Sequence, residues 1–227
     1  MKKFQFIPNP SVNKKHSAPT AIKKLVPDWY KKAEIHWKKG DEELPGLKTC
    51  LPFMDAMITG YALTTPVDIH VSKDEEGNLS IKWDRDSHPG DVLSERMGES
   101  GRTITRPAGH KDNHLIWLSS WGWKVPKGYS VLVTHPLNRF DLPFTTMSAI
   151  VDSDKYFAWG NIPFFIKEDF EGVIPAGTPF AQMLPIKRSK WTYVQNWFLT
   201  KTAVEQGSLM RTGQALYKKL FRSTKDF

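Results

Sequence analysis

The chain has 227 residues, which is long enough for one large domain with a buried core. Its composition, 40% hydrophobic and 12% aromatic, excludes an intrinsically disordered chain, and no apolar run reaches the roughly 18 to 20 residues that a membrane span requires. A single cysteine, Cys50, excludes an intramolecular disulfide framework and predicts a reducing compartment such as the cytoplasm.

The net charge of +8 is unevenly distributed along the chain. Residues 1–48 carry 11 Lys/Arg against 5 Asp/Glu, residues 187–227 carry 9 against 2, and residues 49–186 carry 12 against 17. The two ends are therefore basic, while the middle is mildly acidic. If the protein binds a nucleotide or a polyanion, the basic ends are the expected contact; solvated charge on terminal helices is the alternative explanation.

The first 48 residues are interpreted as a basic arm followed by a helix. Residues 1–22 are rich in Pro, Asn, Ser and Lys, which is typical of an extended arm. A helix is predicted from about Pro27 to Lys39, with Pro27 in its first turn and Gly40 at its end. Three apolar residues recur every four positions in this segment and predict one buried face: Trp29, Ala33 and Trp37.

Residues 49–186 are predicted to form a β domain. A hairpin is expected over residues 67–83, because segments rich in β-branched residues flank the turn sequence DEEGN. Residues 84–114 form a long polar loop in this interpretation, and loops of that length are usually functional or mobile. Short β-rich segments punctuated by Gly and Pro follow from Leu115 to Ile186 and predict a barrel, a jelly roll or a sandwich.

Residues 187–227 are predicted to form a basic helical tail with breaks at Gly207 and Gly213. The fold class expected for the chain is thus mainly β, with an N-terminal helix and a C-terminal helical tail.

Two acids stand one residue apart in the segment MSAIVDSDKYFAWGNIPFFI. Residues i and i+2 of a strand share a face, so Asp152 and Asp154 are candidate catalytic residues, acting as a general base or a ligand pair beside Asn138 and Arg139. The alternative is a turn in which these acids bond to their own backbone.

The segments AIVDSDKYFAWGNIPFFI and GVIPAGTPFAQMLPI together resemble the dUTPase and dCTP-deaminase superfamily. The second segment matches a pattern supplied here by four residues: Ile174, Gly177, Ala181 and Gln182. The resemblance implies a β-clip fold, a small distorted barrel of short strands, and dUTPase ancestry. Ligand-binding candidates on this pattern are Asn138, Arg139, Asn161 and Gln182.

The chain also departs from the pattern of that superfamily. Ala62 follows Gly60 and Tyr61 where active members carry Asp, and Leu137-Asn138-Arg139 stands near the position of the nucleotide loop R-S-G. A basic helical tail replaces the glycine-rich arm that closes over the phosphates. These departures favour a β-clip architecture without triphosphate hydrolysis.

A second resemblance runs from about Trp29 to Trp191. The segments VPDWYKK, KTCLPFMDAMITGYALTTPVDI and FEGVIPAGTPFAQMLPIKR look like an uncharacterised family in tailed-phage genomes with more distant bacterial members. This resemblance implies a phage origin, in the cytoplasm of the infected host or in the virion, and no mechanism.

The sequence GHKDNH places His110, Asp112 and His114 together in the polar loop. With a distant ligand such as His135 or Asp141, this cluster is a candidate site for a divalent metal, Fe(II) or Zn, of the cupin or oxygenase kind. The alternative is a solvated surface loop.

Three functional hypotheses therefore stand. The preferred one is a non-enzymatic binding or assembly module that forms a homo-oligomer or contacts a phage or host protein. The alternatives are a nucleotide-binding or nucleotide-hydrolysing protein of dUTPase ancestry and a metal-dependent oxygenase.

Overall fold

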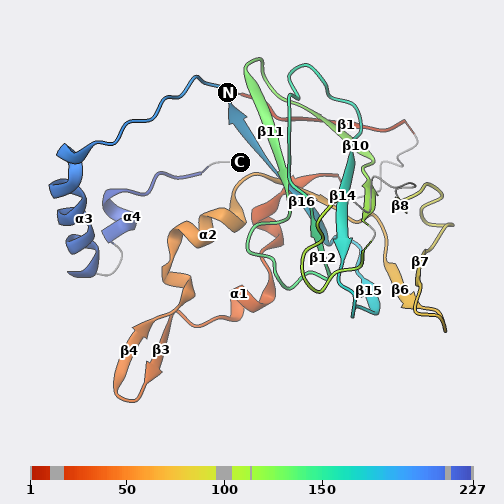
Figure 1. Cartoon of the computed structure of the whole chain (residues 1–227), viewed down its shortest axis with the longest axis horizontal. Helices are drawn as coiled ribbons and strands as arrows, with labels where there is room; N and C mark the ends of the chain where they lie inside the picture. The colour runs from red at the N-terminus through yellow and green to blue at the C-terminus, as the bar shows by residue number, and fades with distance from the viewer. Residues whose placement is uncertain (1, 11–17, 96–103, 113, 213–215, 226–227) are drawn as a thin grey trace.

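The computed structural model describes residues 2–10, 18–95, 104–112, 114–212 and 216–225. It is mainly β, with short strands gathered in a body and two helices at the C-terminal end (Figure 1). The predicted mainly β class and the predicted C-terminal helices are thereby confirmed.

The N-terminal arm lies along the body as strand. Strand β1 (Gln5–Pro8) pairs antiparallel with β10 (Trp121–Lys124), and the short β2 (Thr20–Ala21) pairs with β5 (Tyr61–Thr64). The 3-10 helix η1 (Ile22–Leu25) follows directly. The arm that the sequence predicts as extended is therefore held by backbone hydrogen bonds to two different sheets.

The prediction of a long helix from Pro27 to Lys39 is wrong. Helix α1 (Asp28–Lys32) stops after five residues, and a hairpin of β3 (His36–Lys39) and β4 (Glu42–Pro45) follows. Gly40, expected to end a helix, has a positive φ of 63° in the hairpin turn. Opposite charges face one another across this hairpin, Lys38 with Glu43 and Lys39 with Glu42, and cross-strand pairs of that kind stabilise it.

The expected stripe on that helix is absent as well, since Trp29 and Trp37 are both exposed. The structure instead places a helix where β texture is predicted to begin: α2 (Leu51–Ile58), preceded by the 3-10 helix η2 (Leu47–Thr49). Pro52 suits the first turn of α2.

The hairpin predicted over residues 67–83 is confirmed. It consists of β6 (Ile69–Lys73) and β7 (Leu79–Trp83), with β15 (Gly172–Ile174) as a third strand. Burial alternates along β6, because one face packs on the core. The region 84–114 is not entirely loop, since β8 (Leu93–Glu95) lies within it.

Two larger sheets make up most of the body. One has the strand order β13-β11-β16-β5-β2 and the other β12-β14-β9-β8. The strands not yet introduced are β9 (Leu115–Leu118), β11 (Tyr129–Thr134), β12 (Phe144–Thr146), β13 (Ala149–Val151), β14 (Asn161–Ile166) and β16 (Pro179–Lys187). Within the described residues the strands form five sheets that do not close into a barrel.

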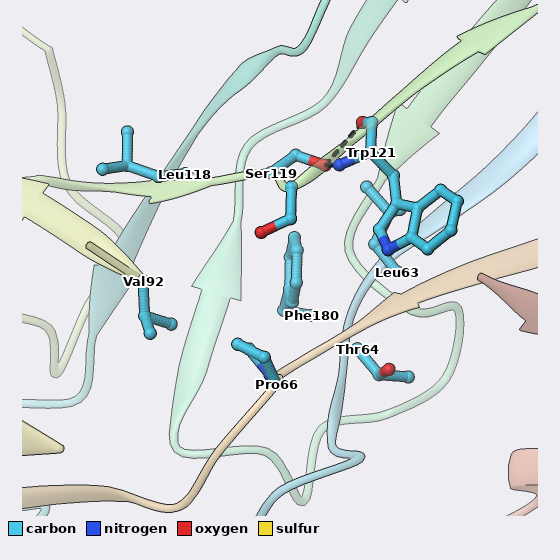
Figure 2. Close-up of a pocket in the computed structure, with 9 residues that line it drawn as sticks. Leu63, Thr64, Pro66, Val92, Leu118, Ser119, Trp121 and Phe180 are labelled. Carbon is cyan, nitrogen blue, oxygen red and sulfur yellow. Dashed lines mark hydrogen bonds between the residues drawn. The ribbon is translucent and has the colours of Figure 1, made fainter. Parts of the chain in front are cut away.

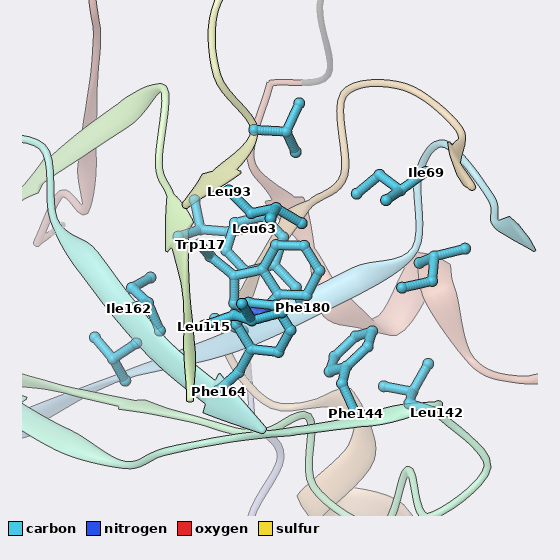
Figure 3. Close-up of a cluster of buried hydrophobic side chains, with 14 of the residues drawn as sticks. Leu63, Ile69, Leu93, Leu115, Trp117, Leu142, Phe144, Ile162, Phe164 and Phe180 are labelled. Carbon is cyan, nitrogen blue, oxygen red and sulfur yellow. The ribbon is translucent and has the colours of Figure 1, made fainter. Parts of the chain in front are cut away.

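A stack of aromatic rings joins the two large sheets. Trp117 of β9 is fully buried, with its ring centroid 4.0 Å from that of Phe164 and 5.0 Å from that of Phe180 (Figure 3). Phe180 belongs to β16 in the other sheet, so this contact fixes the position of one sheet on the other. Aromatic rings of this size contribute much of the energy of a core.

The C-terminal segment leaves this body after β16. It contains the 3-10 helix η4 (Trp197–Leu199), α3 (Thr200–Thr212) and α4 (Leu216–Leu220), and Figure 1 shows both α-helices away from the sheets. Gly207 lies inside α3, so the predicted break there is wrong; one glycine costs a helix only about 1 kcal/mol relative to alanine. Gly213 lies outside the described residues. Among the helices that the structure describes, none is long and apolar enough to cross a membrane.

Candidate functional site

Asp152 and Asp154 lie at the turn that follows β13, which the sequence offers as the alternative to a shared strand face, and both are bound by Arg188. Arg188 Nη1 lies 3.0 Å from Oδ1 of Asp152 and 3.0 Å from Oδ1 of Asp154, and its Nη2 also contacts Asp154. Arg188 is the first residue beyond β16. We call this three-residue group the Arg188 clasp.

Neighbours from β11 and the turn before it complete the clasp. Ser130 Oγ donates a hydrogen bond of 2.7 Å to Asp152, and the backbone N–H of Gly128 donates one of 2.9 Å to Asp154. The Arg188 guanidinium, together with the Gly128 N–H, lowers the pKa of Asp154 to about 2. The Ser130 hydrogen bond and the charge of Arg188 also lower the pKa of Asp152.

A carboxylate with so low a pKa is a poor general base, because efficient proton transfer needs a pKa near the operating pH. Arg188, whose own pKa is raised by Asp154, donates to both oxygens of Asp154 and to Oδ1 of Asp152. The chemistry of the clasp is therefore that of an ionic crosslink between β11, the turn after β13 and the end of β16.

Gln182, predicted to bind a ligand, is fully buried and bonded only to the backbone in the structure. Its Oε1 accepts a hydrogen bond of 2.8 Å from the N–H of Leu137, and its Nε2 donates to the carbonyl oxygens of Ala56 and Thr59 at 2.9 and 2.7 Å. The side chain thus ties β16 to the end of α2 and to the loop after β11. No amide hydrogen of Gln182 is left for a ligand.

Asn138 and Arg139 do not lie beside the acids, and this part of the prediction is wrong. Asp152 contacts Ser130 near the start of β11, whereas Asn138 and Arg139 follow its far end. Asn138, with a positive φ of 61°, donates to the Phe53 carbonyl at 3.2 Å, and Arg139 forms a bidentate ion pair with Asp141. Asn161 is exposed at the start of β14.

The three residues of the GHKDNH cluster have separate surroundings. His110 is buried, with Nδ1 3.0 Å from the Ala108 carbonyl oxygen and Nε2 3.0 Å from Thr145 Oγ1. Asp112 is exposed and pairs with Arg106, while the ring of His114 is buried 5.9 Å from that of Phe165. Among the residues that the structure describes, no three His, Cys, Asp or Glu side chains gather in a way that could hold a metal.

His135, the distant ligand considered for that cluster, is also occupied. Its Nε2 lies 3.0 Å from the Arg139 carbonyl oxygen, and burial lowers its pKa. It therefore closes the turn that begins at Pro136.

Sequence reasoning missed a second ionic contact, made by Asp55 of α2. This buried carboxylate accepts hydrogen bonds from Arg222 at 2.7 and 3.0 Å and from Lys225 at 3.1 Å, and the Arg222 contact lowers its pKa. The partners are more than 160 positions apart, so no local pattern could pair them. The sequence does hold one signal that Asp55 has a partner: it is the single acid in the apolar segment LPFMDAMI, and a buried charge needs a partner.

The cavity between β5, β9 and β16 is too small for a ligand. Figure 2 shows Ser119 and Trp121, linked by a hydrogen bond of 2.7 Å, beside Phe180 and Leu63. The cavity has a volume of about 20 Å³, which suits a single water molecule. A larger hollow of about 330 Å³ lies beside the clasp turn and is lined mainly by apolar residues, among them Trp123, Met147, Tyr156 and Trp159.

No protein-family model and no curated protein sequence matches the chain. Two solved structures of the dUTPase from phage phi11 of S. aureus are similar to it, one of a mutant that describes the coordination of a structural Mg(II) ion and one that shows a species-specific insert. In each case the identity is 13%, the match covers 47% of this chain and 97% of the other, and the TM-score is 0.28. This is a weak likeness of fold, and at that TM-score it carries no argument about residues or activity.

Replacement of Gln182 by alanine tests its structural role. The change leaves an N–H and two carbonyl oxygens without their partner, each costing about 1–3 kcal/mol, so the free energy of unfolding should fall by about 3 kcal/mol or more. Denaturant unfolding measures this loss, and Gln195→Ala, at an exposed position, is the matched control with an expected change within about 0.5 kcal/mol. Equal stability of the two variants would contradict the assignment.

The Arg188 clasp predicts a specific acid sensitivity. Asp154 has a folded-state pKa of about 2, below its ordinary value of 3.8, so its contribution to stability is complete above that ordinary value and is lost as the pH falls toward about 2. Stability measured by denaturant unfolding should therefore fall more steeply between about pH 4 and about pH 2 in the natural chain than in Asp154→Asn. Glu75→Gln, which changes an exposed acid at a hairpin turn, should leave the slope unaltered. Parallel pH profiles for the natural chain and Asp154→Asn would refute the clasp as a source of stability.

Proposed function

We propose that the protein is a non-enzymatic binding or assembly module whose contact surface is its C-terminal arm. We define the C-terminal arm as residues 189–221, of which 213–215 lie outside the described residues. Its partner is a macromolecule: a second copy of the chain, a phage or host protein, or a polyanion. The basic composition of residues 187–227 supports the polyanion in particular.

The observation that carries the proposal is the exposure of the arm. Every residue from Ser189 to Leu209 is exposed, including a whole 3-10 helix and most of α3. Isolated helices of this length are marginal in water, because most helical stability in proteins comes from packing against other elements. A segment that presents so many apolar side chains to solvent is best explained as a surface that a partner covers.

The arm is also attached to the body at both of its ends. The Arg188 clasp lies directly before the arm, and directly after it Arg222 and Lys225 bind Asp55 of the body. A segment tethered at two points loses less conformational freedom on binding than a free tail does. This arrangement favours a binding element over a loosely attached extension.

The engagement of the predicted site residues supports a non-enzymatic module over the two enzymatic alternatives. Asp152 and Asp154 are bound by Arg188, Gln182 is bound by backbone groups, and the two histidines and Asp112 have separate surroundings. The phage setting, in the cytoplasm of an infected host or in the virion, rests on the sequence resemblance and belongs to the same proposal.

A nucleotide assay combined with sedimentation tests the proposal. With dUTP, dCTP or dTTP and Mg²⁺ or Mn²⁺, the natural chain should release no more phosphate or pyrophosphate than Asp152→Asn does. In sedimentation velocity, any self-association should be lost on replacing the exposed aromatic residues of the arm. Turnover of a nucleotide by the natural chain that Asp152→Asn abolishes, with the variant still folded by circular dichroism, would overturn the proposal.

A further inference from the structure

The basic N-terminus and the start of the C-terminal arm meet at one residue, Tyr129. Lys2 donates a hydrogen bond to the Tyr129 hydroxyl, and its Nζ lies 4.6 Å from the centroid of the ring. Arg188 Nη1 donates to the Tyr129 carbonyl at 2.9 Å, and Lys187 pairs with Tyr129 in the sheet. The two basic ends of the sequence are therefore neighbours in space, as the positions of the N-terminus and the end of β16 in Figure 1 also show.

Further positive charge surrounds this meeting point. Lys2 and Lys3 line an open hollow of about 180 Å³ together with Tyr129. Lys127, two positions before Tyr129, is exposed, and so are Lys187 and Lys190. No Asp or Glu occurs between Glu171 and Glu205, so the chain that leads away from this end of the body is uniformly basic. We call these five lysines, four on the body and Lys190 at the start of the C-terminal arm, the basic end of the body.

Exposed aromatic rings follow at once along the arm. Trp191 is 88% exposed, Tyr193 92%, Trp197 78% and Phe198 97%. Residues 188–196 adopt no helix or strand. Trp191 and Tyr193 are two positions apart, and residues at that separation lie about 6.6 Å apart along an extended chain. Stacked bases in a strand repeat at about 3.4 Å, so rings at twice that spacing leave room for one base between them.

We propose that the basic end of the body and the four aromatic rings of the arm form a binding surface for single-stranded nucleic acid. The inference rests on the proposed function and names the partner class of the same arm. The lysines neutralise backbone phosphates, and Trp191, Tyr193, Trp197 and Phe198 stack on unpaired bases. Stacking of this kind tolerates any sequence, because every base has a π-face.

The charge pattern favours this ligand over a second copy of the chain. A protein partner would have to match both uniform positive charge and four aromatic rings, and several acids of the body are already paired within the chain. Asp55, Asp141, Asp152 and Asp154 have Arg or Lys partners. A single strand supplies both phosphates and ring faces, and Lys187 and Lys190 directly precede the four aromatic residues along the chain.

Fluorescence anisotropy with labelled oligonucleotides of about 20 nucleotides tests the inference. The probes are oligo-dT and oligo-U, which distinguish DNA from RNA, and a duplex of the same length. The full chain should bind at least one of the single strands more tightly than the duplex. The variant with Trp191→Ala, Tyr193→Ala, Trp197→Ala and Phe198→Ala should bind it roughly tenfold or more weakly.

Two further variants separate stacking from charge and from general surface effects. Phe140→Ala removes a ring that is 80% exposed beyond the opposite end of β11, and it should bind as the natural chain does. Lys187→Gln combined with Lys190→Gln should lower the slope of log affinity against log salt by about 1.4, or about 0.7 for each phosphate that the variant no longer neutralises. All the substituted residues are exposed, so the variants are expected to stay folded.

The inference is overturned if neither single strand binds, if the duplex binds as tightly as the single strands, or if the four-aromatic variant keeps the affinity of the natural chain. Sedimentation velocity on the same variants then tests the proposed function, that the arm is a binding element, separately from the choice of nucleic acid as its partner. Self-association that is lost in the four-aromatic variant would leave the arm as a binding element while rejecting nucleic acid as its partner.

Discussion

The Arg188 clasp is the interaction on which the rest of the structure depends. One guanidinium at the end of β16 binds the two acids of the turn after β13, while Ser130 and Gly128 hold those acids from the side of β11. The clasp therefore fixes three neighbouring parts of the largest sheet at one end. It also sets the point at which the chain leaves the body, because every residue from Ser189 to Leu209 is exposed.

This arrangement gives the pair of acids a structural role in the body. A general base or a metal site needs carboxylate oxygens that a substrate or an ion can reach. Both oxygens of Asp154 and Oδ1 of Asp152 already accept hydrogen bonds from Arg188, and Gly128 adds a backbone N–H to Asp154. Gln182, inside β16, has a similar role, since it satisfies backbone groups at the end of α2 and in the loop after β11. Polar side chains of the body thus hold its irregular connections together.

The sequence predicts the strands far better than it predicts the contacts of polar side chains. Alternation predicts the β6–β7 hairpin, and the acid turn between β13 and β14 lies where the segment IVDSDKYFAWGNIPFF places it. The prediction of a helix from Pro27 to Lys39 is wrong. It depended on Trp29, Ala33 and Trp37, whose spacing fits a helical period, but Gly40 and the opposed Lys and Glu residues suit a hairpin equally well. The partners of Asp152, Asp154 and Asp55 come from distant segments, and a single sequence holds no local signal for such pairs.

The central claim is that the arm has little support from the body until a partner covers it. Hydrogen–deuterium exchange is the most direct test of this claim. The account predicts that the amides of α3 exchange much faster than those of β16 in the free protein, and that oligo-dT or oligo-U slows exchange in the arm while β11 and β16 are unchanged. Protection of α3 in the free, monomeric chain equal to that of β16 would contradict it.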